Sequence, residues 1–244
     1  MSDLTSNVFP PLWRRGVYEA IYRRRDMRQF LARPVSDKLI RRILRAAHQA
    51  GSVGLMQPWN FLVIRDSETK RRVKQEFVRA NGKAAQAHEG ERLRLYQSLT
   101  LEAIEQAPVN LAVTCDRSRR GPHVLGRDTI LDTDLYSTCC AIQNLWLAAR
   151  AEGIGVGWVS ILDPTTVAKI LGLPEGIVLV GYLCMGYVTR FPDGPTLETA
   201  GWESRLSLDE VLFYDRWGNR ASGNHSADAK PSGTPESPCK GECV

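Results

Sequence analysis

The sequence Arg23-Arg24-Arg25-Asp26-Met27-Arg28-Gln29-Phe30 holds four arginines within six positions and one acid among them. Guanidinium groups pair bidentately with phosphate oxygens, so an arginine cluster at the end of an apolar helix favours a phosphorylated ligand. A solvated basic helix end that faces acids elsewhere is the alternative interpretation. Both interpretations predict that the chain leaves a helix near Arg23 and turns at Pro34.

Asp26 is the unexpected member of this cluster. A carboxylate beside a bound phosphate is unfavourable unless an arginine, or the chemistry itself, compensates for it. If the ligand interpretation holds, Asp26 is therefore the candidate for a chemical role. A salt bridge to Arg23 or Arg28 without further function is the alternative.

Apolar spacing, capping residues and breakers predict the elements on either side of the cluster. Strands are expected over residues 61–65, 109–114, 155–162 and 177–188. Helices are expected up to the cluster, from Ser36-Asp37 to about residue 51, over 67–80, 81–107 and 133–152, from Asp163-Pro164 onward, and near 207–213. The segment 81–107 has few apolar anchors, so we expect it to be weakly buried, and 133–152 to be the central buried helix.

The loop Gly51-Ser52-Val53-Gly54-Leu55-Met56-Gln57-Pro58-Trp59-Asn60 joins a helix to a strand. Its two glycines and one proline around Ser52 and Gln57 suit a backbone that approaches a flat ligand closely. A plain helix-to-strand connection is the alternative.

Composition restricts the class of protein. The chain has 244 residues and a net charge of +5, with the basic residues gathered between Arg14 and Arg45. That distribution fits an anionic small molecule, and no nucleic-acid-binding motif accompanies it. The N-terminus lacks the hydrophobic run of a secretory signal, and the apolar runs are too short to span a membrane. We therefore expect a cytoplasmic protein that binds neither nucleic acid nor membrane.

Cysteine and histidine patterns give no metal site. Four of the six cysteines lie in apolar contexts, which indicates a reducing compartment. Cys239 and Cys243 lie in a polar segment, 219–244, that is expected to be a disordered tail, and one such pair is weak evidence for a metal or redox site. Gly153-Ile154-Gly155-Val156-Gly157 precedes a strand rather than following one, so it is no dinucleotide fingerprint.

Taken together, these segments resemble the FMN-dependent nitroreductase superfamily and, within it, the 5,6-dimethylbenzimidazole synthases. The resemblance covers about residues 12–218. The segments that carry it are Arg24-Arg25-Asp26-Met27-Arg28, Ser52–Phe61, Gly126-Arg127, Asp134–Ser137, Ala141–Arg150, Gly155–Ile161 and Gly201-Trp202. One departure is Gly51, which stands where the family loop is expected to begin with proline.

The resemblance implies an α+β fold, a central and mostly antiparallel sheet flanked by helices, in a homodimer with two FMN sites at its interface. Residues 1–218 are expected to form one flavin domain. Long ordered loops are often lids, so the segments 81–107 and 116–132 are lid candidates, and the lid is expected at about 88–127. The resemblance also implies a reaction in which reduced FMN is the substrate: oxygen fragments it to 5,6-dimethylbenzimidazole, the lower ligand of vitamin B12, and erythrose 4-phosphate is released. A tight lid would hinder reduction on the enzyme, so a flavin reductase that supplies reduced FMN is an expected partner.

Site residues follow from the same resemblance. Asp26 is expected to be a general base, and Ser160 to orient the reacting groups. The residues expected to bind FMN are Arg24, Arg25, Asp26, Met27, Arg28, Ser52, Met56, Gln57, Ser160 and Arg205. No metal is expected. An NAD(P)H-dependent nitroreductase or quinone reductase, or a flavin-binding protein without activity, is the alternative function.

Overall fold

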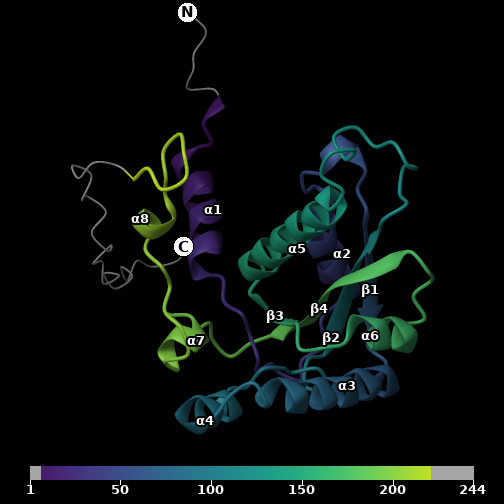
Figure 1. Cartoon of the computed structure of the whole chain (residues 1–244), viewed down its shortest axis with the longest axis vertical. Coiled ribbons are helices and arrows are strands. Elements are labelled where there is room, and N and C mark those ends of the chain that lie inside the picture. The colour runs from purple at the N-terminus through teal and green to yellow at the C-terminus, as the bar shows by residue number, and fades with distance from the viewer. Residues whose placement is uncertain (1–6, 221–244) are drawn as a thin grey trace, which may run out of the picture. The chain divides into compact units, whose positions relative to one another are not determined.

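The computed structural model describes residues 7–220, and the chain divides into two units, Met1–Glu203 and Ser204–Val244. The first unit is built on a four-stranded sheet in the order β1-β2-β4-β3 (Figure 1). Its strands are β1 (Trp59–Ile64), β2 (Val109–Asp116), β3 (Ile154–Val159) and β4 (Ile177–Tyr187). Every neighbouring pair is antiparallel, so the predicted α+β fold with an antiparallel sheet is confirmed.

Helices cover both faces of this sheet (Figure 1). On one face α2 (Asp37–His48) and α5 (Thr133–Ala151) enclose a core with Leu111, Val113 and Val156. On the other face α3 (Ser67–Ala85) and α6 (Pro164–Leu171) enclose a second core with Ala112. Strand β2 supplies both cores because successive side chains of a strand point to opposite faces.

The helix ends follow the expected capping chemistry. The Ser36 hydroxyl accepts a hydrogen bond from the Leu39 N–H at 3.3 Å and starts α2, and the Asp163 carboxylate accepts one from the Thr166 N–H at 2.7 Å and starts α6. The predicted central helix is confirmed in α5, which buries Ile142, Leu145 and seven other side chains. This helix is the scaffold that both parts of the candidate site contact.

The predicted weakly buried helix over 81–107 is wrong in its second half. Within this range α3 continues to Ala85 and α4 spans Gly90–Ser98, but residues 99–107 are not helical. Ala103, Ile104 and Ala107 in this last part are at most 1% exposed. The Lys70 ammonium donates a hydrogen bond to the Ala107 carbonyl at 2.5 Å and ties this segment to α3. Ala103, Ile104 and Ala107 are part of the second core, although the surrounding composition is polar.

Strand β2 also limits where a lid can lie. It is buried within the sheet from Val109 to Cys115. Any lid within the expected range 88–127 is therefore confined to the segments on either side of this strand.

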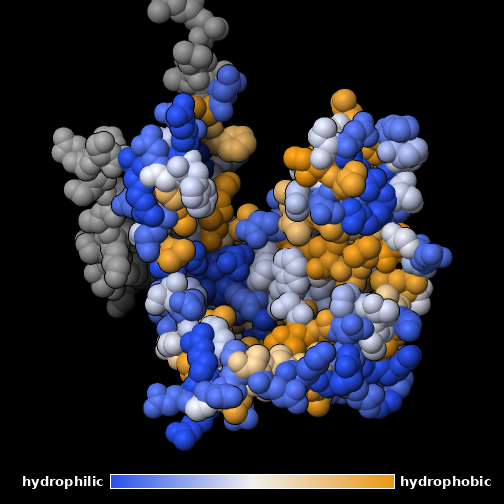
Figure 2. All heavy atoms as spheres, in the orientation of Figure 1, coloured by the Kyte–Doolittle hydropathy of each residue, from blue (hydrophilic) through white to orange (hydrophobic). Residues whose placement is uncertain are grey.

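Helix α1 (Pro11–Arg23) buries none of its side chains in this chain. Its large apolar residues are exposed, with Leu12 at 76%, Trp13 at 64% and Tyr22 at 70%. Figure 2 shows hydrophobic surface both over α1 and over the part of the molecule that contains α5. The first unit ends with α7 (Thr196–Thr199).

The second unit contains α8 (Leu208–Val211), which starts with a capping box between Ser207 and Glu210. Arg205 belongs to this unit. The expected tail over 219–244, with Cys239 and Cys243, lies outside the described residues from position 221 onward.

Candidate functional site

The arginine-rich segment lies against the edge of the sheet. The Met27 N–H donates a hydrogen bond to the Val156 carbonyl at 3.0 Å, and Asp26 forms an isolated parallel bridge with Val156. Gly157 makes this approach possible, because a Cβ there would lie 1.9 Å from the Met27 carbonyl oxygen. A Cβ on Gly155 would lie 2.4 Å from a methyl group of Val188. Gly157 therefore lets the backbone at Met27 pack directly on the strand, and Gly155 leaves room for the side chains of Val188 and Met27.

Asp26 is held by both of its carboxylate oxygens. Oδ1 accepts a hydrogen bond from the Trp158 N–H at 2.9 Å, and Oδ2 lies 2.5 Å from Nη2 of Arg28. The side chain nevertheless keeps 43% of its surface exposed. Burial raises the pKa of Asp26 above its usual value of 3.8, and the nearby Arg28 guanidinium and the Trp158 N–H offset part of this rise. A carboxylate with a raised pKa is a stronger base than an ordinary aspartate.

Arg28 points inward, toward Asp26 and the backbone. Nη2 donates to the Trp158 carbonyl at 2.7 Å, and Nη1 donates to the Met27 carbonyl at 3.1 Å. Its side chain is only 17% exposed. The donors of Arg28 are therefore directed at the protein itself in this structure.

Arg24 and Arg25 are fixed by α5. The Arg24 guanidinium lies 4.7 Å from the centre of the Trp146 ring, and the Trp146 indole N–H donates to the Arg25 carbonyl at 3.2 Å. Arg25 Nη1 donates to the carbonyls of Tyr22 and Arg24, both at 2.7 Å, and Nη2 donates to that of Asp193. Its Nε is buried without a hydrogen-bond partner among the described residues. Such a buried unpaired donor is uncommon in proteins, and an anionic ligand is one group that could satisfy it.

The loop with Ser52 and Gln57 contacts the other end of α5. The Ser52 hydroxyl accepts a hydrogen bond from the Gln57 N–H at 2.8 Å, and the Val53 N–H donates to the Ser137 hydroxyl at 3.2 Å. Gln57 has a φ of 48° and Leu55 a φ of 49°, a left-handed conformation that is costly for both residue types. Backbone held in such a conformation is often found at ligand sites.

Within this loop, Gly54 and Met56 face protein atoms. A Cβ on Gly54 would lie 2.6 Å from the Leu125 carbonyl oxygen, so the loop packs closely on the segment around Leu125. Met56 is 1% exposed and forms part of the packing beneath the loop. Ser52 and Gln57 are partly exposed, as is Val53, and Leu55 is 70% exposed.

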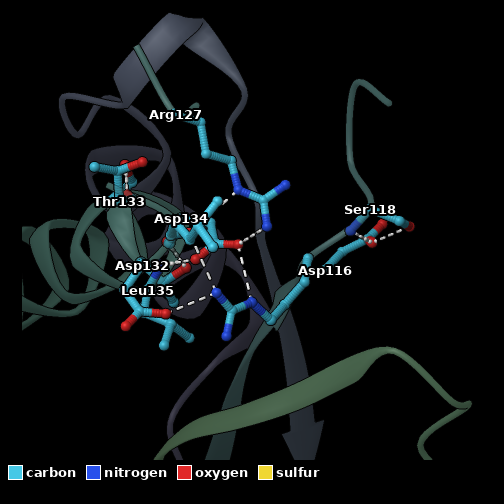
Figure 3. A network of polar contacts seen from close by, with 11 residues as sticks. Asp116, Ser118, Arg127, Asp132, Thr133, Asp134 and Leu135 are labelled. Carbon is cyan, nitrogen blue, oxygen red and sulfur yellow. Dashed lines mark hydrogen bonds and ion pairs between the residues drawn. The ribbon is translucent and has the colours of Figure 1, made fainter. Parts of the chain in front are cut away.

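A buried carboxylate holds the segment on which this loop packs (Figure 3). Asp134 has no exposed surface, and its Oδ2 lies 2.8 Å from Nη2 of Arg127 and 3.1 Å from Nε of Arg117. Arg117 also pairs with Asp132 at 2.7 Å. These ion pairs hold the residues between β2 and α5 against the N-terminal end of α5. Our sequence reasoning gave Asp134 no role, although an acid in the first turn of an apolar helix was a visible signal.

Ser160 follows β3 directly, whereas the sequence predicted it inside the strand. It is exposed and lines a cavity of about 220 Å³ together with Trp158, Pro164 and Tyr182. It lies two residues beyond Trp158, whose N–H holds Asp26.

The expected site residues therefore form two groups on the first unit. The first group, Arg24 to Arg28, contacts β3 and Trp146 in the C-terminal half of α5. The second group, Ser52 to Gln57, contacts Ser137 near its N-terminus. Nine positions of helix separate Ser137 from Trp146, which corresponds to about 13 Å along the axis. The contact expected for Arg205 stays a prediction, because that residue belongs to the second unit.

Between residues 7 and 220, no group of three or more His, Cys, Asp or Glu side chains is placed to hold a metal ion. Within the same residues, no helix is both long and apolar enough to cross a membrane.

Comparison with known proteins identifies related sequences. The nitroreductase family model matches residues 21–187. The chain is 41% identical to a 5,6-dimethylbenzimidazole synthase of Rhodospirillum rubrum, over 82% of this chain and 95% of that protein. It is 37% identical to a protein of the same name from Rhodobacter capsulatus, over 82% of this chain and 97% of that protein.

More distant relatives share the fold. The chain is 28% identical to a putative NADH dehydrogenase/NAD(P)H nitroreductase of Archaeoglobus fulgidus, over 68% of this chain and 82% of that protein. A BluB-like flavoprotein from Clostridium difficile superimposes with a TM-score of 0.63 at 18% identity, over 82% of this chain and 99% of that one. An iodotyrosine deiodinase bound to FMN superimposes with a TM-score of 0.62 at 22% identity, over 73% of this chain and 94% of that one.

Proposed function

The chain belongs to the nitroreductase family and, within it, to the 5,6-dimethylbenzimidazole synthases, and from that premise we propose that it uses molecular oxygen to fragment reduced FMN. The products are 5,6-dimethylbenzimidazole and erythrose 4-phosphate. The observation that carries this proposal is the 41% identity to a synthase over 95% of that protein's length. FMN supplies the ring that becomes the product, and the protein binds it, shields it from water and moves protons.

The residues present fit FMN. The buried Arg25 Nε lacks a partner among the described residues, and Arg24 lies over Trp146, so these two arginines are suited to hold the phosphate. The loop from Ser52 to Gln57 offers strained backbone and partly exposed polar side chains for the ring system. We assign Arg205 a second phosphate contact on the resemblance alone.

Asp26 is our candidate for the general base. Its carboxylate is partly exposed, held in one direction by the Trp158 N–H, and has a raised pKa. These properties suit a group that takes a proton from the ribityl chain during carbon–carbon cleavage. Ser160 lies beyond the same backbone stretch, and we assign it the role of orienting the reacting groups.

We further propose that the protein is a homodimer with two FMN sites at its interface. Helix α1 exposes Leu12, Trp13, Val17 and Tyr22 without burying any side chain in its own chain. A 13-residue helix of this kind is marginal in water unless a partner covers its apolar residues. A second copy that covers α1 would also explain why the two groups of site residues lie apart on one chain.

A product assay tests the proposed reaction. The purified protein is incubated with reduced FMN and oxygen, and 5,6-dimethylbenzimidazole is measured by chromatography and mass spectrometry. We expect the product to appear in proportion to the FMN consumed. Supplying FMN and NADPH with and without a separate flavin reductase tests whether that partner is needed.

The same assay separates the alternatives. The similarity to the Archaeoglobus fulgidus protein makes an NAD(P)H-dependent reductase the second candidate. Repeated reduction of a nitroaromatic compound or a quinone, with FMN intact after many cycles, would establish that function. FMN that binds tightly and is neither consumed nor turned over would indicate a binding protein.

A further inference from the structure

Arg119 binds the segment that leads from the candidate site into strand β1. Its Nη1 donates hydrogen bonds to the carbonyl of Gln57 at 3.1 Å and to that of Trp59 at 3.3 Å. Its Nη2 donates to Oδ1 of Asn60 at 2.5 Å. One guanidinium therefore contacts three residues of this segment.

Gln57 is a strained residue of the loop, and side chains fix both of its backbone polar groups. Its φ of 48° lies in the left-handed region, and the proline that follows restricts the backbone further. The Ser52 hydroxyl accepts a hydrogen bond from the Gln57 N–H at 2.8 Å, and Arg119 donates to its carbonyl. A strained conformation persists only where the surrounding structure over-determines it, and these two contacts supply that constraint.

From these contacts we propose that Arg119 is a positioning residue for FMN binding. By holding the carbonyl of Gln57, it keeps the loop in the conformation that presents the partly exposed side chains of Ser52 and Gln57 to the ligand. This inference rests on the proposed function, in which the same loop binds the FMN ring system. Arg119 acts through the backbone of the loop, whereas Ser52 and Gln57 would contact FMN themselves.

The turn after β2 directs Arg119 toward the loop. The Asp116 N–H donates to the Pro58 carbonyl at 2.8 Å, so the pairing of β1 with β2 continues to the start of this turn. One oxygen of Asp116 accepts hydrogen bonds from the N–H and the hydroxyl of Ser118 (Figure 3), and the other lies 3.4 Å from Nε of Arg119. The guanidinium is therefore oriented from the strand side as well as from the loop side.

The neighbouring arginines have different partners. Arg117 and Arg127 both pair with the buried Asp134, at 3.1 Å and 2.8 Å. Both also donate to the Leu131 carbonyl, so their contacts lie on the segment that leads into α5. The contacts of Arg119 lie instead on residues 57–60, at the end of the loop that carries Gln57.

This set of contacts requires a guanidinium. Its planar fork can donate to several acceptors at fixed angles, whereas an ammonium is a point charge on a flexible stem. Arg119→Lys keeps the charge and can retain part of the contacts, and Arg119→Gln removes both the charge and the fork. Arg72→Gln is the matched control, because it removes one guanidinium from the exposed surface of α3.

The first measurement is a thermodynamic cycle on the melting temperature of the FMN-free protein. Gln57→Gly relieves the left-handed strain and should raise the melting temperature of the wild type by about 1–3 °C. In Arg119→Gln the loop is released from this conformation, so the same substitution should give no gain. An equal gain in both backgrounds would show that Arg119 does not hold the strained conformation, and would overturn the inference.

The second measurement is the affinity for oxidised FMN, determined by fluorescence. Arg119→Gln should weaken binding by about tenfold, and Arg119→Lys by less. In a Gln57→Ala background the positioned side chain is absent, so Arg119→Gln should weaken binding further by less than about threefold. Arg72→Gln should bind FMN as the wild type does.

Two results of the affinity measurement contradict the proposal. Native FMN affinity in Arg119→Gln would remove the positioning role. A loss of about tenfold in both the wild-type and the Gln57→Ala background would mean that Arg119 acts on FMN independently of Gln57. If Arg119→Gln does not fold, both cycles are run with Arg119→Lys. Failure of the proposed function is recognised separately, because the wild type then forms no 5,6-dimethylbenzimidazole, while the melting-temperature cycle still tests Arg119.

Discussion

At the scale of single residues, Asp26 is an acid in an arginine cluster, where a carboxylate would be unfavourable beside a bound phosphate. Burial raises the pKa of Asp26, and Arg28 together with the Trp158 N–H keeps the carboxylate held and directed. The raised pKa has a consequence for stability. The folded protein binds the proton of Asp26 more readily than the unfolded chain, so this group contributes less stability as the pH rises from its usual value of 3.8 through the higher folded value.

Asp26→Asn should therefore separate stability from activity. The amide oxygen can still accept the Trp158 N–H, and the cost of a partly buried charge disappears. We expect a melting temperature at pH 7.5 equal to or above that of the wild type, with the difference shrinking as the pH is lowered toward 5. Product formation should fall by at least about 100-fold, because general base catalysis contributes on that order.

Calorimetry and the product assay check both halves of this prediction. A variant that melts several degrees below the wild type would mean that the ion pair with Arg28 outweighs the cost of burial. A variant that forms product at the native rate would remove Asp26 from the proposed chemistry.

The sequence predicted a site residue where the residue type is unusual for its surroundings. Asp26 stood out as one acid among four arginines. The contacts that hold Asp26 and Arg28 could not be predicted, because both residues form hydrogen bonds with backbone atoms of Trp158, about 130 positions away in the chain.

At the scale of elements, the site depends on the contact between residues 26–28 and β3. Periodicity and caps predicted this strand and the neighbouring helices, because each signal is local. The segment 101–107 escaped prediction, since its burial comes from tertiary contacts with α3 and β2. Gly155 and Gly157 were visible in the sequence, but only the structure shows that residues 26–28 pack against them.

Gly157→Ala tests this contact. The added Cβ would lie 1.9 Å from the Met27 carbonyl and 2.3 Å from the Arg28 guanidinium, so one of them must move. We expect a loss of about 1–3 kcal/mol in the free energy of unfolding, as for other overpacked sites, and a large loss of FMN affinity. Chemical denaturation and fluorescence titration measure these two quantities.

Gly82→Ala is the matched control, because it adds the same methyl group inside α3, where nothing lies within 4 Å. That variant should be as stable as the wild type or more stable by about 0.5–1 kcal/mol. Native FMN binding in Gly157→Ala would show that residues 26–28 do not need to pack on β3.

At the scale of the whole molecule, the two groups of site residues lie near opposite ends of α5, about 13 Å apart along its axis. In a dimer with two-fold symmetry, each surface patch meets its equivalent on the other copy. If α5 lies antiparallel to the α5 of the second copy, the Arg24 group of one subunit comes next to the Ser52 group of the other. Each FMN site would then draw on both chains.

A subunit-mixing experiment decides whether sites are shared. One variant carries Arg24→Ala and Arg25→Ala, and the other carries Ser52→Ala and Gln57→Ala, each with its own affinity tag. Both pure variants should bind FMN poorly, because each lacks one group in both sites.

In dimers with one subunit of each kind, one site has both groups intact and the other has neither. Random mixing makes half of all dimers mixed, so FMN binding and product formation should return to about a quarter of the wild-type level. Doubly tag-purified mixed dimers should reach about half. If mixed dimers form and remain as inactive as their parents, every site is built within one chain, and the separation along α5 must be bridged by FMN itself.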